Sequence, residues 1–248
     1  MIYFASDIHL GGGGEAFARA NEQRFVAWLD RVARDAEAIV LAGDVFDFWF
    51  EKGRHIPDGY DRVLDKFREV TGRGIRLIFF TGNHDMWLNG YFERECGMEV
   101  HTKPQTMQFK GKRVFVAHGD NINIGCKIGV RLLNIGFRSR MLRWIFETVC
   151  PYEFILRLGR AWSAHSLKKH ASDTDTNFDE TLTEPLIEYA REYRKTHEVD
   201  HFVFGHMHFP RNYCKDGLHV VNLGGWEKCP SYAVLDDRGE LTLKMLDE

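Results

Sequence analysis

Five short apolar segments of this chain each run directly into side chains that can bind a metal ion. The ligand-capable residues at these places are, in chain order, Asp7 and His9; Asp44; Asn83 and His84; His118; and His206 and His208. Short apolar segments predict buried strands, and sites in open α/β sheets form just beyond the carboxyl ends of strands. The pattern therefore predicts an α/β fold that gathers these side chains into one site.

The remaining pattern alternates at first between strands and helices. Strands are expected at residues 2–5, 38–42, 76–81, 106–109, 113–117, 201–204, 218–223, 232–235 and 241–245. Apolar residues at helical spacing predict helices over 15–36 and 60–70, with two or three more between 127 and 197. No repeat, low-complexity tract or long linker interrupts this order, so we expect a single domain spanning residues 1–248.

The donor atoms at the strand ends are carboxylate and amide oxygens and imidazole nitrogens, with no thiolate. Such a mixed set suits Mn²⁺, Fe or Zn²⁺ better than Ca²⁺ or a structural zinc site. It holds more groups than one tetrahedral ion can use, and enough for two ions that share a bridging carboxylate. Two such ions can clamp the attacking and leaving oxygens of a phosphoryl displacement and lower the pKa of a water molecule. We therefore expect two divalent ions, with Mn²⁺ preferred to Fe or Zn²⁺.

Each of these residues has a simpler explanation when it is taken alone. Asp7 could cap the turn after its strand, and Asp44 or Asn83 could be an ordinary turn residue. His118 could be a core histidine with satisfied hydrogen bonds. The metal interpretation is favoured because unrelated turns would not place a ligand-capable residue at the end of every one of these strands.

Five motifs carry a resemblance to a known family. They are Asp7-Ile8-His9, Gly43-Asp44-x-x-Asp47, Gly82-Asn83-His84-Asp85, His118-Gly119-Asp120 and Gly205-His206-x-His208. In order and spacing, this set resembles that of the calcineurin-like metallophosphoesterases, and it spans nearly the whole chain. The resemblance implies a four-layer αββα sandwich that carries a dinuclear metal site and hydrolyses phosphoric esters.

The resemblance also implies roles for individual residues. Asp7, His9, Asp44 and His208 would hold the first ion, and Asp44, Asn83, His118 and His206 the second, with Asp44 as the bridge. His84 would contact the phosphate or protonate the leaving oxygen, so the expected catalytic residues are His84, Asp44 and Asn83. Asp47, Asp85 and Asp120 would orient imidazoles by accepting hydrogen bonds from them.

Residues 124–170 lie outside the metal motifs and are expected to form a helical insert, or lid, between strands. Their basic residues are Lys127, Arg131, Arg138, Arg140, Arg143, Arg157, Arg160, Lys168 and Lys169, against Glu147 and Glu153. The whole chain has a formal charge of −3, so this basic excess is local. Together with many large apolar residues, it suits an anionic membrane surface or a groove for acyl chains. The alternative is a cap with a solvated basic face, while a nucleic-acid groove is disfavoured because aliphatic residues outnumber aromatic ones.

The insert resembles that of the family members that cleave UDP-2,3-diacylglucosamine in lipid A synthesis. This resemblance implies hydrolysis of the pyrophosphate bond of a lipid-linked sugar nucleotide, to a lipid sugar 1-phosphate and UMP. It implies substrate contacts by Asn83, His84, Asn123, Arg160, Ser163, Lys168, Lys169 and His206. The chain departs from the common pattern at His84, where arginine is usual, at Leu167, where asparagine is usual, and around Asn121 and Asn123, where an acidic residue is expected.

The cysteines and the N-terminus bear on location. Five scattered cysteines without a C-x-x-C pair fit reduced thiols. The N-terminal residues lack the pattern of a signal peptide, and no apolar run reaches the ~18 residues of a membrane span. We therefore expect a cytoplasmic protein, peripheral on the cytoplasmic face of the inner membrane, with no nucleic-acid partner and no obligate protein partner. The alternative functions are a soluble metallophosphoesterase of nucleotide or protein phosphoesters and a metal-binding scaffold without catalysis.

Overall fold

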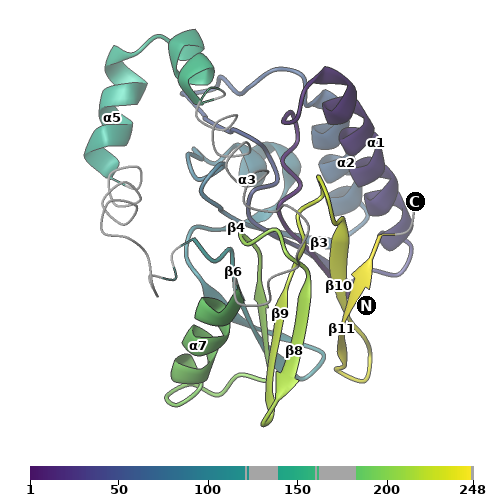
Figure 1. The fold of residues 1–248 in the computed structure, drawn as a ribbon. Helices are drawn as coiled ribbons and strands as arrows, with labels where there is room; N and C mark the ends of the chain where they lie inside the picture. The colour runs from purple at the N-terminus through teal and green to yellow at the C-terminus, as the bar shows by residue number, and fades with distance from the viewer. Residues whose placement is uncertain (121, 123–138, 160, 162–182, 247–248) are drawn as a thin grey trace.

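The computed structural model describes residues 1–120, 122, 139–159, 161 and 183–246, and its strands form two sheets (Figure 1). The first sheet contains β1 (Ile2–Ala5), β2 (Ala38–Ala42), β3 (Arg76–Phe80), β4 (Glu99–His101), β10 (Ser231–Leu235) and β11 (Leu241–Met245), in the spatial order β11-β10-β1-β2-β3-β4. The second contains β5 (Gln105–Phe109), β6 (Lys112–Ala117), β7 (His201–Phe204), β8 (Arg211–Lys215) and β9 (Leu218–Asn222), in the order β5-β6-β7-β9-β8.

Parallel pairing brings the ends of the central strands to one edge of each sheet. In the first sheet β1 pairs parallel with β2, and β2 pairs parallel with β3. In the second sheet β6 pairs parallel with β7, and β7 with β9. Strands that run parallel end at the same edge of a sheet, so the loops that leave β1, β2 and β3 emerge together, as do those that leave β6 and β7.

The two sheets pack face to face through alternate residues of their strands. On β1, Ile2 and Phe4 join the core between the sheets, where they share a cluster with Val116 of β6 and Val203 of β7. Ala5 of β1 points to the opposite face and joins a different cluster. This division follows from the two-residue period of a strand, which sends successive side chains to opposite faces of the sheet.

Helices cover the outer face of each sheet. Against the first sheet lie α1 (Glu15–Val32), α2 (Asp61–Gly72) and α3 (Tyr91–Cys96), whose buried residues include Phe25, Trp28, Phe67 and Phe92. Against the second sheet lies α7 (Glu184–Tyr193), which packs Leu186, Ile187 and Ala190 on Phe115 and Phe202. The predicted four-layer αββα arrangement is therefore confirmed (Figure 1).

Two helical segments from the predicted insert are described. The first, α5 (Arg140–Val149), projects away from the two sheets at the upper left of Figure 1. The second spans residues 152–159. Phe146 and Ile155 pack with Phe50 and Trp87 in a small separate cluster. The insert boundaries, 124–170, stay a prediction, because residues 124–138, 160 and 162–170 lie outside the described residues.

Some elements differ from those expected. The first helix ends at Val32 instead of residue 36, and β4, β8 and α3 were not predicted. The strand β8 is an edge strand of polar residues with the sequence RNYCK, so it lacks the alternating apolar pattern on which strand prediction depends. In the part of the chain that the structure describes, no helix is long and apolar enough to span a bilayer.

Candidate metal centre

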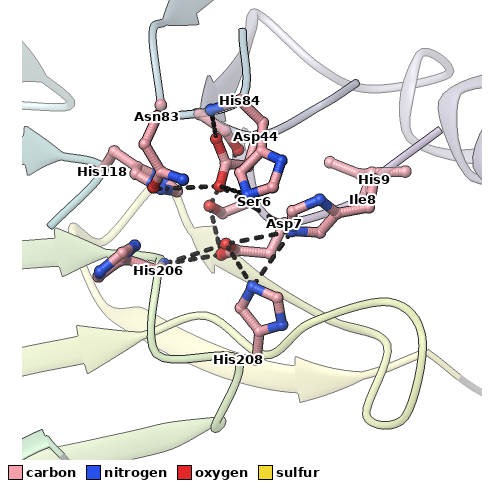
Figure 2. Close-up of polar contacts among 12 residues, drawn as sticks. Ser6, Asp7, Ile8, His9, Asp44, Asn83, His84, His118, His206 and His208 are labelled. Carbon is pink, nitrogen blue, oxygen red and sulfur yellow. Dashed lines mark hydrogen bonds and ion pairs between the residues drawn. The ribbon is translucent and has the colours of Figure 1, made fainter. Parts of the chain in front are cut away.

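The ligand-capable side chains converge at the edge where parallel strands of both sheets end (Figure 2). Asp7 and His9 follow β1, Asp44 follows β2, Asn83 and His84 follow β3, His118 follows β6, and His206 and His208 follow β7. Both sheets therefore contribute to one site. Most of these side chains are buried, and Asn83, His206 and His208 are partly exposed.

Five of these residues have left-handed backbone conformations. Their φ angles are 54° at Asp7, 50° at His9, 52° at Asp44, 71° at His206 and 53° at His208. A residue other than glycine rarely takes a positive φ, and each costs on the order of 1–3 kcal/mol unless its surroundings hold it there. Backbone strain of this kind clusters at functional sites, and here it turns several side chains into the same space (Figure 2).

Two glycines allow the loops to approach one another closely. A Cβ atom on Gly82 would collide with the carboxylate and backbone of Asp44. A Cβ atom on Gly205 would collide with the side chains of Ser6 and Asp7. The absence of a side chain at these two positions therefore lets loops from different strands meet around the carboxylates.

The first cluster is built around Asp7. Ser6 Oγ donates a hydrogen bond to Asp7 Oδ2 at 2.7 Å, and the backbone N–H of His206 donates to both carboxylate oxygens, at 3.1 and 2.9 Å. Nε2 of His208 lies 3.2 Å from Asp7 Oδ1 and 3.1 Å from Nε2 of His9. The donors from Ser6 and His206 fix the carboxylate, and the two imidazoles share the space in front of it.

The second cluster is built around Asp44. Nε2 of His118 lies 3.1 Å from Asp44 Oδ2 and 3.3 Å from Asn83 Oδ1. The other ring nitrogen of His118, Nδ1, lies 3.0 Å from the carbonyl oxygen of Ala42 and therefore carries the proton that it donates there. This arrangement leaves Nε2 of His118 to face the site. One possible donor atom from each of Asp44, His118 and His206 lies within 4.8 Å of the other two.

Asp44 also faces the first cluster. Its Oδ2 atom is 3.9 Å from Nε2 of His9 and 4.0 Å from Nε2 of His84. Its other oxygen, Oδ1, accepts a hydrogen bond from the backbone N–H of His84 at 2.8 Å. Asp44 therefore lies between the two clusters, where a bridging carboxylate would have to be.

The buried carboxylates require positive charge near them. Burial alone would raise the pKa of Asp7, but the imidazoles of His208 and His118 lower it to about 2. Burial also opposes ionisation of Asp44, yet His118 and His84 hold the pKa of Asp44 well below its ordinary value. Burial would lower the pKa of His118, but the Asp44 carboxylate holds it well above the ordinary value. Among the described residues, no Lys or Arg forms an ion pair with either carboxylate.

A divalent cation would supply the positive charge that such a site needs. Three groups of donor atoms lie within 4.8 Å of one another: Asp7, His9 and His208; His9, Asp44 and His84; and Asp44, His118 and His206. Buried carboxylates and imidazoles in this combination are ligands for transition-metal ions. The donor set therefore fits a dinuclear metal site.

His84 is held by its ring and its backbone. Nδ1 of His84 lies 2.7 Å from the carbonyl oxygen of Asp47 and donates its proton there. Nε2 consequently faces the site, and the ring meets that of His9 edge to face, with centroids 4.8 Å apart. An imidazole fixed in this way can donate or accept a proton at Nε2.

Two further carboxylates lie beside the ligands. Oδ1 of Asp47 is 3.7 Å from Nδ1 of His9, on the side of that ring opposite Nε2. Asp85 was expected to orient an imidazole, but it accepts hydrogen bonds from the backbone N–H groups of Gly82 and Val45, each at 2.8 Å. Burial and the charge of Asp44 raise the pKa of Asp85 to about 7. Asp85 therefore joins the loops after β2 and β3.

An apolar pocket opens beside the metal centre. It is lined by Phe48, Trp49, Asn83, His84, Met86, Trp87, Phe146, Ile155, Leu158 and Gly159, and it holds about 670 Å³ of empty space, partly open to solvent. Asn83 and His84 therefore border both the metal centre and the pocket. Sequence reasoning missed Phe48, Trp49, Met86 and Trp87, and the available signal was that these apolar residues directly follow the metal motifs.

The predicted substrate contacts divide into two groups. Asn83, His84 and His206 lie at the metal centre. Asn123, Arg160, Ser163, Lys168 and Lys169 lie outside the described residues.

Comparisons with known proteins agree with this chemistry. A family model described as calcineurin-like phosphoesterase matches residues 1–210. A protein of Porphyromonas gingivalis named UDP-2,3-diacylglucosamine hydrolase is 35% identical over 247 residues, covering 95% of this chain and 94% of that protein. A protein of the same name from Actinobacillus succinogenes is 26% identical over 211 residues, covering 83% of each. Among solved structures, an archaeal phosphodiesterase is similar in fold, with a TM-score of 0.50, 12% identity and 99% of each chain covered.

Proposed function

Because this chain belongs to the calcineurin-like phosphoesterase family, we propose that it hydrolyses the pyrophosphate bond of UDP-2,3-diacylglucosamine, or of a close lipid-linked sugar nucleotide. The products would be a lipid sugar 1-phosphate and UMP. One observation carries the proposal: Asn83 and His84 border the metal centre on one side and the apolar pocket on the other. A substrate whose phosphates are attached to an acylated sugar needs both surfaces within reach.

Two metal ions would be shared among the strand-end residues. The proposed ligands are Asp7, His9, Asp44 and His208 for one ion, and Asp44, Asn83, His118 and His206 for the other. We assign Mn²⁺ to both positions, with Fe or Zn²⁺ as the alternatives, because the donors are oxygen and imidazole nitrogen. When bound, two such ions lower the pKa of a water molecule and draw charge from the phosphoryl oxygens.

The protein groups then position the substrate and move a proton. Hydrolysis forms a bond between a water oxygen and one phosphorus, and it breaks the bond from that phosphorus to the bridging oxygen. His84 Nε2 is placed to contact the phosphate or, when the ring carries a proton on both nitrogens, to give the Nε2 proton to the leaving oxygen, while Nδ1–H stays on the backbone carbonyl oxygen of Asp47. Asn83 lies beside His118 and extends the polar border of the pocket.

The apolar pocket would receive the acylated part of the substrate. Small-molecule sites are usually lined by apolar side chains with a few polar groups at the border, as this pocket is. Its walls are aromatic and aliphatic side chains from the loops after β2 and β3, from α5 and from the helix at 152–159. The basic residues proposed as further substrate contacts, Arg160, Lys168 and Lys169, would neutralise phosphate charge, with Asn123 and Ser163 as hydrogen-bonding partners.

We further propose that the insert rests on the cytoplasmic surface of the inner membrane, as a lid within a single domain of residues 1–248. Exposed apolar side chains support this proposal. Met141 and Val149 are each 71% exposed and Trp144 is 61% exposed on α5, and Phe154 and Leu158 are about half exposed on the next helix. Such a surface, in a segment rich in Arg and Lys, is typical of helices that bind anionic membranes.

Hydrolysis of the proposed substrate is the direct test. Purified protein is incubated with Mn²⁺ and UDP-2,3-diacylglucosamine in mixed micelles, and UMP and the lipid sugar 1-phosphate are measured. Both products should appear in equal amounts, and the Asp44→Ala variant should form neither. If the protein cleaves bis(p-nitrophenyl) phosphate but releases no UMP from UDP-2,3-diacylglucosamine at high enzyme concentration, the lipid substrate is contradicted. Rapid turnover of nucleotide or protein phosphoesters would favour a soluble phosphoesterase instead.

A further inference from the structure

Glu51 is a buried carboxylate that the proposed chemistry does not use. It lies in the loop after β2, and only 1% of its surface is exposed. Its Oε1 atom accepts a hydrogen bond from the indole Nε1 of Trp49 at 3.1 Å. Its Oε2 atom accepts from the backbone N–H of Asn89 and, at 3.1 Å, from that of Tyr91. One carboxylate therefore joins two segments that lie almost forty residues apart in the chain.

The two segments run side by side at the pocket. The backbone N–H of Trp49 donates to the carbonyl oxygen of His84 at 3.0 Å, and that of Glu51 donates to the carbonyl oxygen of Trp87 at 3.0 Å. Phe50 and Trp87 form a parallel bridge between them. The side chain of Glu51 extends this pairing, because it holds the backbone just beyond Trp87.

These segments form two walls of the apolar pocket. Phe48 and Trp49 line it from the first segment, and Met86 and Trp87 line it from the second. His84, which opens the second segment, borders the metal centre. The distance between the walls, and their position relative to the reacting phosphate, therefore depends on contacts that converge on Glu51.

A carboxylate at a buried structural position costs more free energy than an apolar side chain does. Burial raises the pKa of Glu51 above its ordinary value, and the donors from Trp49, Asn89 and Tyr91 counteract that effect. A buried charge costs free energy unless hydrogen bonds satisfy it, and an apolar side chain could fill the same space without that cost. Unlike an apolar side chain, a carboxylate can accept hydrogen bonds from three donors at once and so fix the direction of each donor.

We propose that Glu51 is a positioning residue that holds the walls of this pocket in register, and so sets the preference of the site for an apolar group beside the reacting phosphate. This inference rests on the proposed function, because it assumes that the pocket receives part of the substrate. Glu51 acts through Trp49 and through the backbone at Asn89 and Tyr91, without touching the substrate.

A series of p-nitrophenyl alkyl phosphodiesters, from methyl to dodecyl, tests the proposal without the natural substrate. The reacting group is the same in each ester, and only the apolar group changes. In the wild-type protein kcat/KM should rise at least tenfold from the methyl to the dodecyl ester. In Glu51→Gln the ratio of kcat/KM for the dodecyl ester to kcat/KM for the methyl ester should fall at least fivefold, mainly through KM of the long-chain esters. The reason is that the amide N–H₂ of glutamine would face an N–H donor at a place where the carboxylate accepts a hydrogen bond.

Glu99→Gln is the matched control. Glu99 also accepts hydrogen bonds from side chains, those of Arg76 and His101, but neither of these partners lines the pocket, whereas the Glu51 partner Trp49 does. Its chain-length ratio should stay within twofold of the wild-type value. If Glu51→Gln does not fold, Glu51→Asp keeps the charge but shortens the side chain by one methylene, so it should reach the three donors less well and lower the same ratio.

Two outcomes would overturn the inference. An equal loss of kcat/KM for methyl and dodecyl esters in Glu51→Gln would mean that Glu51 only stabilises the fold. A wild-type protein that cleaves all the esters equally well would mean that the pocket receives no apolar group. If UDP-2,3-diacylglucosamine does not react but the alkyl phosphodiesters still show the expected dependence on chain length, only the proposed function is contradicted.

Discussion

The Nε2 atoms of His9 and His208 lie 3.1 Å apart, although 199 residues separate them in the chain. This separation is compatible with two imidazoles that bind one ion through metal–nitrogen bonds of about 2.1 Å. His9 follows the first strand of one sheet and His208 follows a strand of the other. The proposed first metal position therefore depends on correct packing of the two sheets against each other.

Replacement of Asp44 should affect both metal positions at once, because its carboxylate lies between the two clusters. We expect Asp44→Ala to lose bound Mn²⁺ and to lower kcat for bis(p-nitrophenyl) phosphate at least about 10²–10³-fold, the usual effect of removing a group that stabilises transition-state charge. Metal content by mass spectrometry and steady-state kinetics measure these effects. Asp216→Asn, in the tight turn between β8 and β9, should change neither.

Removal of the metal ions should lower the thermal stability of the protein. Each ion that binds only the folded state at 100 times its Kd stabilises that state by about 2.7 kcal/mol. For a chain of this length, chelation should therefore lower Tm by roughly 5–10 °C per ion. Calorimetry with and without EDTA measures this shift, and Asp44→Ala should respond much less. An identical Tm in EDTA and in excess Mn²⁺ would argue against a metal site.

Gly205→Ala should disturb the first cluster through its backbone. The added Cβ atom would collide with Ser6 Oγ and Asp7 Oδ2, so either the loop or the Asp7 carboxylate must move. We expect a loss of about 1–3 kcal/mol in the free energy of unfolding and weaker Mn²⁺ binding. Urea denaturation and metal titration measure both. Gly72→Ala is the control, since a Cβ atom at that position meets nothing within 4 Å.

Stability should decrease in mild acid through a histidine pair remote from the metal centre. Nδ1 of His219 lies 3.0 Å from Nδ1 of His201, whose Nε2 donates to the carbonyl oxygen of Gly239. Burial and then the charge of His201 lower the pKa of His219 to about 4. The folded state therefore resists protonation more than the unfolded state does. Its stability should fall as the pH decreases from about 6.5 toward 4.

His219→Gln isolates this contribution. The difference in unfolding free energy between pH 7.5 and pH 5.0 should be smaller in His219→Gln than in the wild-type protein, as measured by urea denaturation in EDTA. His197→Gln, at an exposed position after α7, should keep the wild-type difference. An unchanged pH dependence in His219→Gln would show that this pair does not contribute.

The exposed face of α5 should bind membranes if the insert rests on a bilayer. Trp144 is 61% exposed, and its transfer to the interface is worth about 1.5 kcal/mol, or roughly tenfold in affinity. We expect Trp144→Glu to bind vesicles containing phosphatidylglycerol at least fivefold more weakly in flotation assays. Met245→Glu, on β11, provides an exposed apolar control that should bind as the wild-type protein does.

The fold class was predictable because its signals are local. Alternating or continuous apolar residues predicted β1, β2, β6 and β7, and parallel pairing then required their ends to meet at one edge of each sheet. The pattern of ligand-capable residues after those strands was likewise readable along the chain. Edge strand β8 was missed because its residues are polar.

The details of the site were not predictable in this way. Asp85 is fully buried, but the sequence does not show that its partners are the backbone N–H groups of Gly82 and Val45. The left-handed conformations of Asp7 and Asp44 also arise from contacts between loops. Such partners depend on segments that are distant in sequence and adjacent only after folding.

The sequence by itself determined the chemistry of this protein, since the identity of a ligand-capable residue and the strand before it are local properties of the chain. It therefore indicated an α/β fold and a site of carboxylates and imidazoles, and the resemblance of the five motifs to a known family implied the four-layer αββα arrangement. The tertiary structure alone decided which atoms lie together, as at His9 and His208, and it created the apolar pocket that Glu51 adjoins. The physical reason is that a pocket belongs to no single segment: its walls come from the loops after β2 and β3, α5 and the helix at 152–159, which only long-range packing brings together.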